Sequence, residues 1–106
     1  MAKVINGVKY YPISERWLFG LESMRDKCTY WLTCEIENFS EEEIEKIEAL
    51  QEECEKLLWK VRSGWADGKT LGRIKEITYQ REQIRFNACI ENGMDYKNAA
   101  KAVNGE

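Results

Sequence analysis

The chain has 106 residues, of which 43% are apolar and 33% are charged, and it carries a net charge of −3. This length allows one modest hydrophobic core, so we expect a single folded domain over residues 1–106 and exclude a disordered chain. No apolar run approaches the roughly 20 residues of a membrane span, and the first residues lack a secretory signal. We therefore expect a cytoplasmic protein without membrane contact.

The first twelve residues predict a β-hairpin, over residues 1–12. Residues 3–5 and 8–10 read as two short strands, and Asn6-Gly7 between them is a strong hairpin signal, because both turn positions require a positive φ. A hairpin alone is only marginally stable. We therefore expect its Val4, Ile5 and tyrosine side to dock onto helices, or the hairpin to add to another strand.

A helix over residues 14–37 is predicted next, with Ser14 as its N-cap. Apolar residues recur along it at spacings of four, three, four and three, which predicts a buried stripe. These residues are Trp17, Leu21, Met24, Cys28 and Trp31. Phe19 and Tyr30 fall on the opposite side, where we expect them to meet the hairpin or to form a second contact surface.

A second helix is predicted over residues 41–63. Ser40 and Glu43 have the spacing of a capping box, and Phe39 and Ile44 have that of a hydrophobic staple. The buried stripe of this helix is expected to contain Ile44, Ile47, Leu50, Cys54, Leu57, Leu58 and Val61. Trp59 faces away from the stripe, and residues 65–68 are expected to form the connection to the next helix.

A third helix is expected over residues 71–92, capped by Thr70 and stopped by Gly93, and a short helix over residues 95–103. The predicted fold class is therefore mainly α. An N-terminal β-hairpin is followed by a three-helix bundle and a short C-terminal helix.

The third helix has a second apolar stripe, formed by Tyr79, Phe86 and Ile90 and turned by about 120° or more from the first. One chain offers few helices to cover both stripes. We expect the hairpin or a second chain to cover this side, and we favour a homo-oligomer.

Gly68-Lys69-Thr70 raises the question of a phosphate-binding loop. A P-loop requires G-x-x-x-x-G-K-[ST] after a buried strand, whereas only three residues separate Gly64 from Gly68 and the preceding segment is predicted to be helical. We exclude nucleoside triphosphate hydrolysis on these grounds.

Two arginines of the third helix, Arg81 and Arg85, project among its apolar residues. A buried guanidinium requires a partner, so these side chains must pair with carboxylates, reach water between subunits, or bind an anion. Structural pairing with glutamates of the second helix or of another subunit is the first interpretation. The alternative is an anionic nucleotide site, for which the candidate residues are Lys69, Arg73, Tyr79, Arg81 and Arg85.

Residues 41–58 contain eight glutamates against two lysines. A solvated helix face accounts for such a pattern, but it also suits a partner-binding surface that resembles nucleic acid in charge. The candidate partner-binding residues are Glu41, Glu42, Glu45, Glu48, Glu52 and Glu55.

The sequence of residues 93–105, GMDYKNAAKAVNG, resembles the first helix of the helix-turn-helix in phage small terminases and resolvases. The resemblance implies DNA binding. Those families continue with a recognition helix, for which no sequence remains before Glu106, so a DNA-binding accessory protein is kept only as a further alternative.

Catalytic and metal-binding patterns are missing from the sequence, which contains no histidine. Cys28 and Cys34 lie about 240° apart on a helix and cannot share an ion, so we expect structural thiols, no metal and no cofactor. We therefore expect a non-enzymatic binding protein, a regulator or inhibitor from a phage or mobile element that binds a host protein in the bacterial cytoplasm. The alternative is an oligomeric protein that sequesters an anionic nucleotide.

Overall fold

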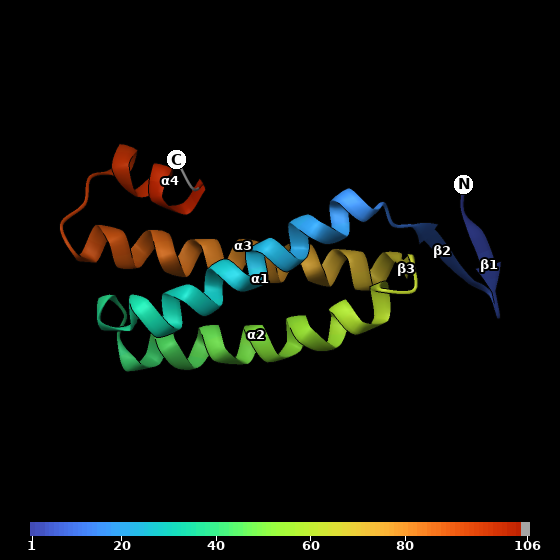
Figure 1. Ribbon diagram of the computed structural model, residues 1–106, viewed down its shortest axis with the longest axis horizontal. Helices are drawn as coiled ribbons and strands as arrows, with labels where there is room; N and C mark the ends of the chain where they lie inside the picture. Colours follow the sequence, from blue (N-terminus) through green and yellow to red (C-terminus); the bar gives the residue numbers. More distant parts are fainter. Residues whose placement is uncertain (105–106) are drawn as a thin grey trace.

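The computed structural model describes residues 1–104, and it confirms the predicted fold class: a mainly α chain with an N-terminal hairpin (Figure 1). Its elements are β1 (Lys3–Ile5), β2 (Val8–Pro12), α1 (Glu15–Cys34), a 3-10 turn (Ile36–Asn38), α2 (Glu41–Val61), β3 (Trp65–Asp67), α3 (Gly68–Glu91) and α4 (Tyr96–Asn104). The three long helices lie side by side, and the molecule extends over 50 × 25 × 19 Å. None of the helices described combines the length and apolar character needed to cross a membrane.

The predicted turn of the hairpin is confirmed, since Asn6 and Gly7 both have positive φ, at 51° and 79°. The hairpin projects from one end of the helices in Figure 1, and Val4 and Ile5 are exposed. Val4 and Ile5 therefore do not dock onto the helices, whereas Tyr10 of β2 is half-buried. The other alternative holds, because β2 pairs with a third strand, β3.

The strand β3 corrects our reading of residues 65–68 as a plain connection. Tyr11 pairs with Ala66 in the antiparallel register, so the hairpin is tied to the helices through the chain between α2 and α3. A strand, and not a helix, therefore directly precedes Gly68-Lys69-Thr70. The P-loop is still excluded by spacing, because α3 begins immediately after β3 and no loop is left to surround a phosphate.

The helix boundaries show which caps were read correctly. The side chain of Ser14 accepts a hydrogen bond from the Trp17 backbone N–H, and Ser40 and Glu43 form the predicted capping box. The prediction of Thr70 as the N-cap of α3 was wrong. Asp67 is the N-cap, since its Oδ1 accepts a hydrogen bond from the Thr70 backbone N–H at 2.7 Å, and α3 therefore starts at Gly68 and not at residue 71. Asp67 can act as the N-cap because it is the last residue of β3 and has the extended backbone conformation that an N-cap requires.

The end of α1 also differs from the prediction, since it stops at Cys34 and not at residue 37. A 3-10 turn follows and brings Phe39 back into the protein, with its ring 6.4 Å from that of Trp31. Burial of Phe39 thus requires an earlier turn than the helical pattern alone suggests.

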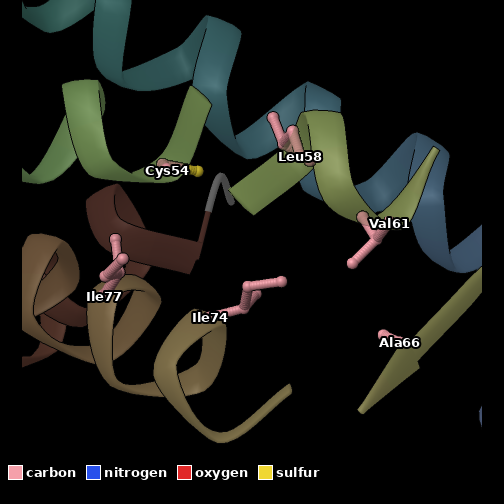
Figure 2. Close-up of a cluster of buried hydrophobic side chains, with 6 residues drawn as sticks. All are labelled: Cys54, Leu58, Val61, Ala66, Ile74 and Ile77. Atoms are coloured by element: carbon pink, nitrogen blue, oxygen red, sulfur yellow. The ribbon is translucent and has the colours of Figure 1, made fainter. Parts of the chain in front are cut away.

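Two clusters of buried side chains hold the helices together. The cluster in Figure 2 joins α2, β3 and α3 and contains Cys54, Leu58, Val61, Ala66, Ile74 and Ile77. The second contains Cys28, Trp31, Phe39, Ile47 and Ala88 and joins α1, α2 and α3 at the other end of the bundle.

The short helix α4 folds back beside α3 (Figure 1). The rings of Phe86 and Tyr96 are 5.5 Å apart, and Ala99 and Val103 of α4 are buried. At Phe86 it is therefore α4, and neither the hairpin nor a second chain, that covers this side of α3, whereas Tyr79 of the same stripe stays exposed. Residues 93–104 of the helix-turn-helix resemblance are described, and Gly105 lies outside the described residues.

Phe19 and Tyr30 remain exposed on the outer side of α1. They do not meet the hairpin, which extends away from the helices. Of the two expectations for these residues, the contact with the hairpin was wrong, and the second contact surface stays a prediction.

Candidate functional site

A groove with a volume of about 510 Å³ lies between α2 and α3. Both walls come from these two helices and none from α1. The lining residues are Lys46, Ala49, Leu50, Glu53, Arg73, Tyr79, Gln80, Gln83 and Ile84. We call this feature the α2/α3 groove.

Arg73 lies in the wall of the groove and is already occupied by carboxylates. Its Nη2 donates to Glu53 Oε1 at 2.7 Å, its Nε donates to the other oxygen of Glu53, and its Nη1 donates to Glu76 at 3.0 Å. These hydrogen bonds raise the pKa of Arg73, and the guanidinium in turn lowers the pKa of Glu53. Two carboxylates therefore offset the positive charge that an anionic ligand would need.

Arg81 lies inside the helical body, with 1% of its surface exposed. One of its terminal nitrogens donates to the side-chain oxygen of Gln51 on α2, and its Nε has no partner in the described structure. The partner of this arginine is thus an amide, whereas a glutamate was the predicted partner. Hydrogen bonding to a dipole compensates a buried charge less completely than an opposite charge does.

Arg85 is buried one turn further along α3, and its Nη2 donates to Glu35 Oε1 at 3.1 Å. Its guanidinium carbon lies 5.3 Å from the ring centre of Trp31 and 5.8 Å from that of Phe39. This arginine therefore has a carboxylate and two aromatic rings as neighbours. The carboxylate comes from the C-cap of α1 and not from the second helix as predicted.

The five residues proposed for anion binding are not brought together in one place. Arg73 and Tyr79 line the α2/α3 groove, while Arg81 lies in the interior. Arg85 lines a separate cavity of about 180 Å³ together with Glu35, and Lys69 is exposed in the first turn of α3. Charge in the groove is balanced, so its chemistry favours a neutral or mixed surface as partner.

The six glutamates proposed for partner binding fall into two groups. Glu42 pairs with Lys46 at 3.2 Å, Glu52 with Lys56 at 3.7 Å and Glu55 with Arg25 at 3.1 Å. Glu41, Glu45 and Glu48 are exposed and form no ion pair among the described residues. Free carboxylates are thus concentrated in the first half of α2.

An exposed tryptophan lies on the same side of α2 as these carboxylates. Spacings of four, three, four and seven residues bring five side chains to one outer stripe. They are Glu41, Glu45, Glu48, Glu52 and Trp59, and we call this set the acidic stripe. Trp59 is 69% exposed, and its ring lies 4.5 Å from the guanidinium of Arg62.

Two of these functional features were missed from the sequence although signals for them existed. From the sequence, Trp59 was predicted to point outward but was not placed on the same side of the helix as the glutamates, although the helical spacing of these residues predicts this. Gln51 interrupts the apolar series between Ile47 and Cys54, and a polar residue there indicates a buried hydrogen-bond partner.

The four cysteines are all free thiols, of which Cys28, Cys54 and Cys89 are buried and Cys34 is exposed. Burial raises the pKa of Cys28 to about 11, so this thiol stays protonated near neutral pH. Within the described part of the chain, no three His, Cys, Asp or Glu side chains gather around a position that would hold a metal ion.

Comparison of the chain with protein-family models, with curated proteins and with solved structures found no match.

Proposed function

We propose that this protein is a non-catalytic binding protein whose acidic stripe holds a basic surface of a protein partner. The observation that carries the proposal is the continuity of the stripe. From Glu41 to Trp59 it extends over about 27 Å of one helix side, and three of its carboxylates form no ion pair with any residue that the structure describes.

The two chemical parts of the stripe have different roles in this proposal. Rows of like charge speed up encounter with an oppositely charged surface and orient it. Exposed tryptophan supplies the contact area that anchors many protein interfaces. The glutamates would therefore select a basic partner, and Trp59 would hold it.

The partner that we propose is a host protein of a bacterial cell, with the chain acting as a regulator or inhibitor encoded by a phage or mobile element. A row of carboxylates on a helix offers a charge pattern related to that of a phosphate backbone. By occupying a basic surface used for nucleic acid, the protein would inhibit without catalysis. The small size of the chain and the paired charges of the α2/α3 groove support this role.

Nucleotide sequestration remains the second candidate, because Arg73 and Tyr79 do line one cavity. It is less well supported, since Glu53 and Glu76 already occupy Arg73. A DNA-binding accessory role is supported least, because Ala99 and Val103 of α4 are buried in the protein.

The test is a pull-down from bacterial lysate with three immobilised proteins at equal density. These are the parent, the stripe variant Glu41→Gln/Glu45→Gln/Glu48→Gln, and a control of equal charge change, Glu15→Gln/Asp26→Asn/Glu37→Gln. The control residues are exposed and lie outside the stripe. We expect the parent and the control to retain the same basic protein and the stripe variant to lose it.

Retention of the same proteins by all three would contradict the proposal. A second variant, Trp59→Ala, separates the contribution of the glutamates to association from that of Trp59 to holding the bound partner. We expect it to raise the dissociation rate of the identified partner with little change in the association rate, whereas the glutamine variant should lower the association rate in a salt-dependent way.

A further inference from the structure

The α2/α3 groove continues beyond its central cavity. A neighbouring cavity of about 390 Å³ shares Lys46 and Ile84 with it and extends to Ser40 and Glu91. The groove therefore follows the two helices along most of their length. It lies on a different side of α2 from Trp59, which lines neither cavity.

The middle of the groove combines apolar side chains with Lys46 and the Arg73–Glu53 ion pair, and further charged side chains lie toward its ends. Leu50 and Ile84 are half-buried in the groove, and Tyr79 is 63% exposed. By helical spacing, Lys60 and Lys69 lie on the groove side of α2 and α3 near β3, and Glu42 and Glu91 lie on it at the opposite end. The groove side is therefore positive at one end and negative at the other.

These charges are arranged symmetrically about the middle of the groove. Lys60 and Glu42 are each nine residues from Gln51, or about 13.5 Å along α2. Lys69 and Glu91 are each eleven residues from Gln80, or about 16.5 Å along α3. Gln51 and Gln80 lie at nearly the same level, because Arg81, the neighbour of Gln80, donates to Gln51.

We propose that this groove is the interface of a symmetric homodimer. A two-fold axis that crosses the helices at the level of Gln51 and Gln80 places α2 on α2 and α3 on α3 of the second copy, antiparallel in each case. Lys60 of each copy then faces Glu42 of the other, and Lys69 faces Glu91. Leu50 and Tyr79, each one residue from the level of the axis, pack at the centre.

The occupant is a second copy because the groove complements itself in charge. A foreign helix would need the same reversed charge pattern, whereas a second copy supplies it by symmetry. Lys46 and Lys56, which the axis also brings near each other, are already paired with Glu42 and Glu52. Like charges therefore do not oppose the dimer strongly.

The contact is expected to be of moderate size. Two helices side by side, each about 10 Å wide and about 30 Å long, give a face of about 600 Å² per copy. That is below the roughly 800 Å² of a standard interface, so the dimer should dissociate on dilution. The acidic stripe lies on the outer side of α2, so failure of either proposal leaves the other intact.

The first test uses charge exchange at Lys69 and Glu91, measured by sedimentation equilibrium over a range of protein concentrations. Both Lys69→Glu and Glu91→Lys suit the dipole of α3, because the changes put acid in its first turn and base in its last. If a variant fails to dimerise, unfolding of α3 is therefore not the cause. We expect each single variant to weaken the dimer about tenfold or more.

The double variant Lys69→Glu/Glu91→Lys restores both cross-pairs, so it should dimerise like the parent yet form no mixed dimer with it. A parent that stays monomeric at the highest concentration overturns the proposal. A dimer whose dissociation constant is unchanged by both single substitutions also overturns the proposal, because its interface must then lie elsewhere.

The second test uses a position on the axis itself. Gln80→Cys, in a Cys34→Ser background that removes the exposed native thiol, should join two chains through a short bis-maleimide, since the two copies of residue 80 face each other. Ser23→Cys in the same background is the control, because residue 23 is exposed on α1 away from the groove. Equal crosslinking of the two variants overturns the proposed axis.

Discussion

Arg81 donates a hydrogen bond to the side-chain oxygen of Gln51 in the middle of the helical body. The guanidinium is almost completely buried and has an amide, and no carboxylate, as its hydrogen-bond partner in the described structure. Gln51 is itself held in place, since its Nε2 donates to the Arg25 carbonyl oxygen at 3.0 Å. The amide thus joins α1, α2 and α3 at one point.

Removal of Gln51 is expected to destabilise the protein through this arginine. Gln51→Ala leaves a buried charge without its acceptor, and we expect a loss of about 2 kcal/mol in the free energy of unfolding. In an Arg81→Met background the same change should cost about 1 kcal/mol or less, because the charge is gone. Urea unfolding of the parent, the two single variants and the double variant measures the coupling energy between Gln51 and Arg81. Additive losses in the free energy of unfolding would contradict this coupling.

Ser40 is expected to contribute to stability through the capping box of α2. Ser40→Ala should lower the free energy of unfolding by about 1 kcal/mol, since the Glu43 backbone N–H loses its acceptor. Ser23→Ala, at an exposed position inside α1, is the control and should change it far less. Thermal melting and urea unfolding of both variants provide the measurement.

Asp67 should make part of the stability depend on pH. Hydrogen bonds from the Thr70 hydroxyl and backbone N–H lower the pKa of Asp67 below its ordinary value of 3.8. A carboxyl with a lowered pKa in the folded state stabilises fully above its unfolded pKa, and that contribution is lost as the pH falls through the folded value.

Asp67→Asn keeps a side-chain oxygen at the cap but removes the charge. The parent should therefore be more stable than this variant near neutral pH, and the difference should shrink below about pH 4. Unfolding curves of the two proteins across that range test the prediction. A difference that does not change with pH would show that the charge of Asp67 does not contribute.

The thiols should react in two groups because only Cys34 is exposed among the four. We expect an aromatic disulfide reagent to modify one thiol of the native protein rapidly and the other three only on unfolding. The raised pKa of Cys28 slows it further, since the thiolate is the reacting form. Cys34→Ser should remove the rapid phase, and its persistence would place another cysteine at the surface.

Nucleotides should not stabilise the protein if the arginines are structural. A specific site at 100-fold ligand excess over the dissociation constant would add about 2.7 kcal/mol to the free energy of unfolding. We expect no shift in melting temperature with mono-, di- or cyclic nucleotides, because Arg73, Arg81 and Arg85 are occupied separately. A shift that Arg73→Ala abolishes would favour nucleotide sequestration instead.

Much of the local structure was determined by short stretches of sequence. Asn6-Gly7 set the hairpin turn, and Ser14 and Ser40 set the starts of two helices. These features depend on the backbone preference or hydrogen bonding of residues within four positions of one another. Sequence therefore contains their physical cause completely.

Only the tertiary structure decided which distant segments meet. The strand β3 is three residues long and exists because β2 pairs with it, and α4 covers α3 because Ala99 and Val103 find an apolar side there. The partners of Arg81 and Arg85 likewise come from residues 30 and 50 positions away. Such contacts are selected by packing of whole helices, which the periodicity of any one helix does not specify.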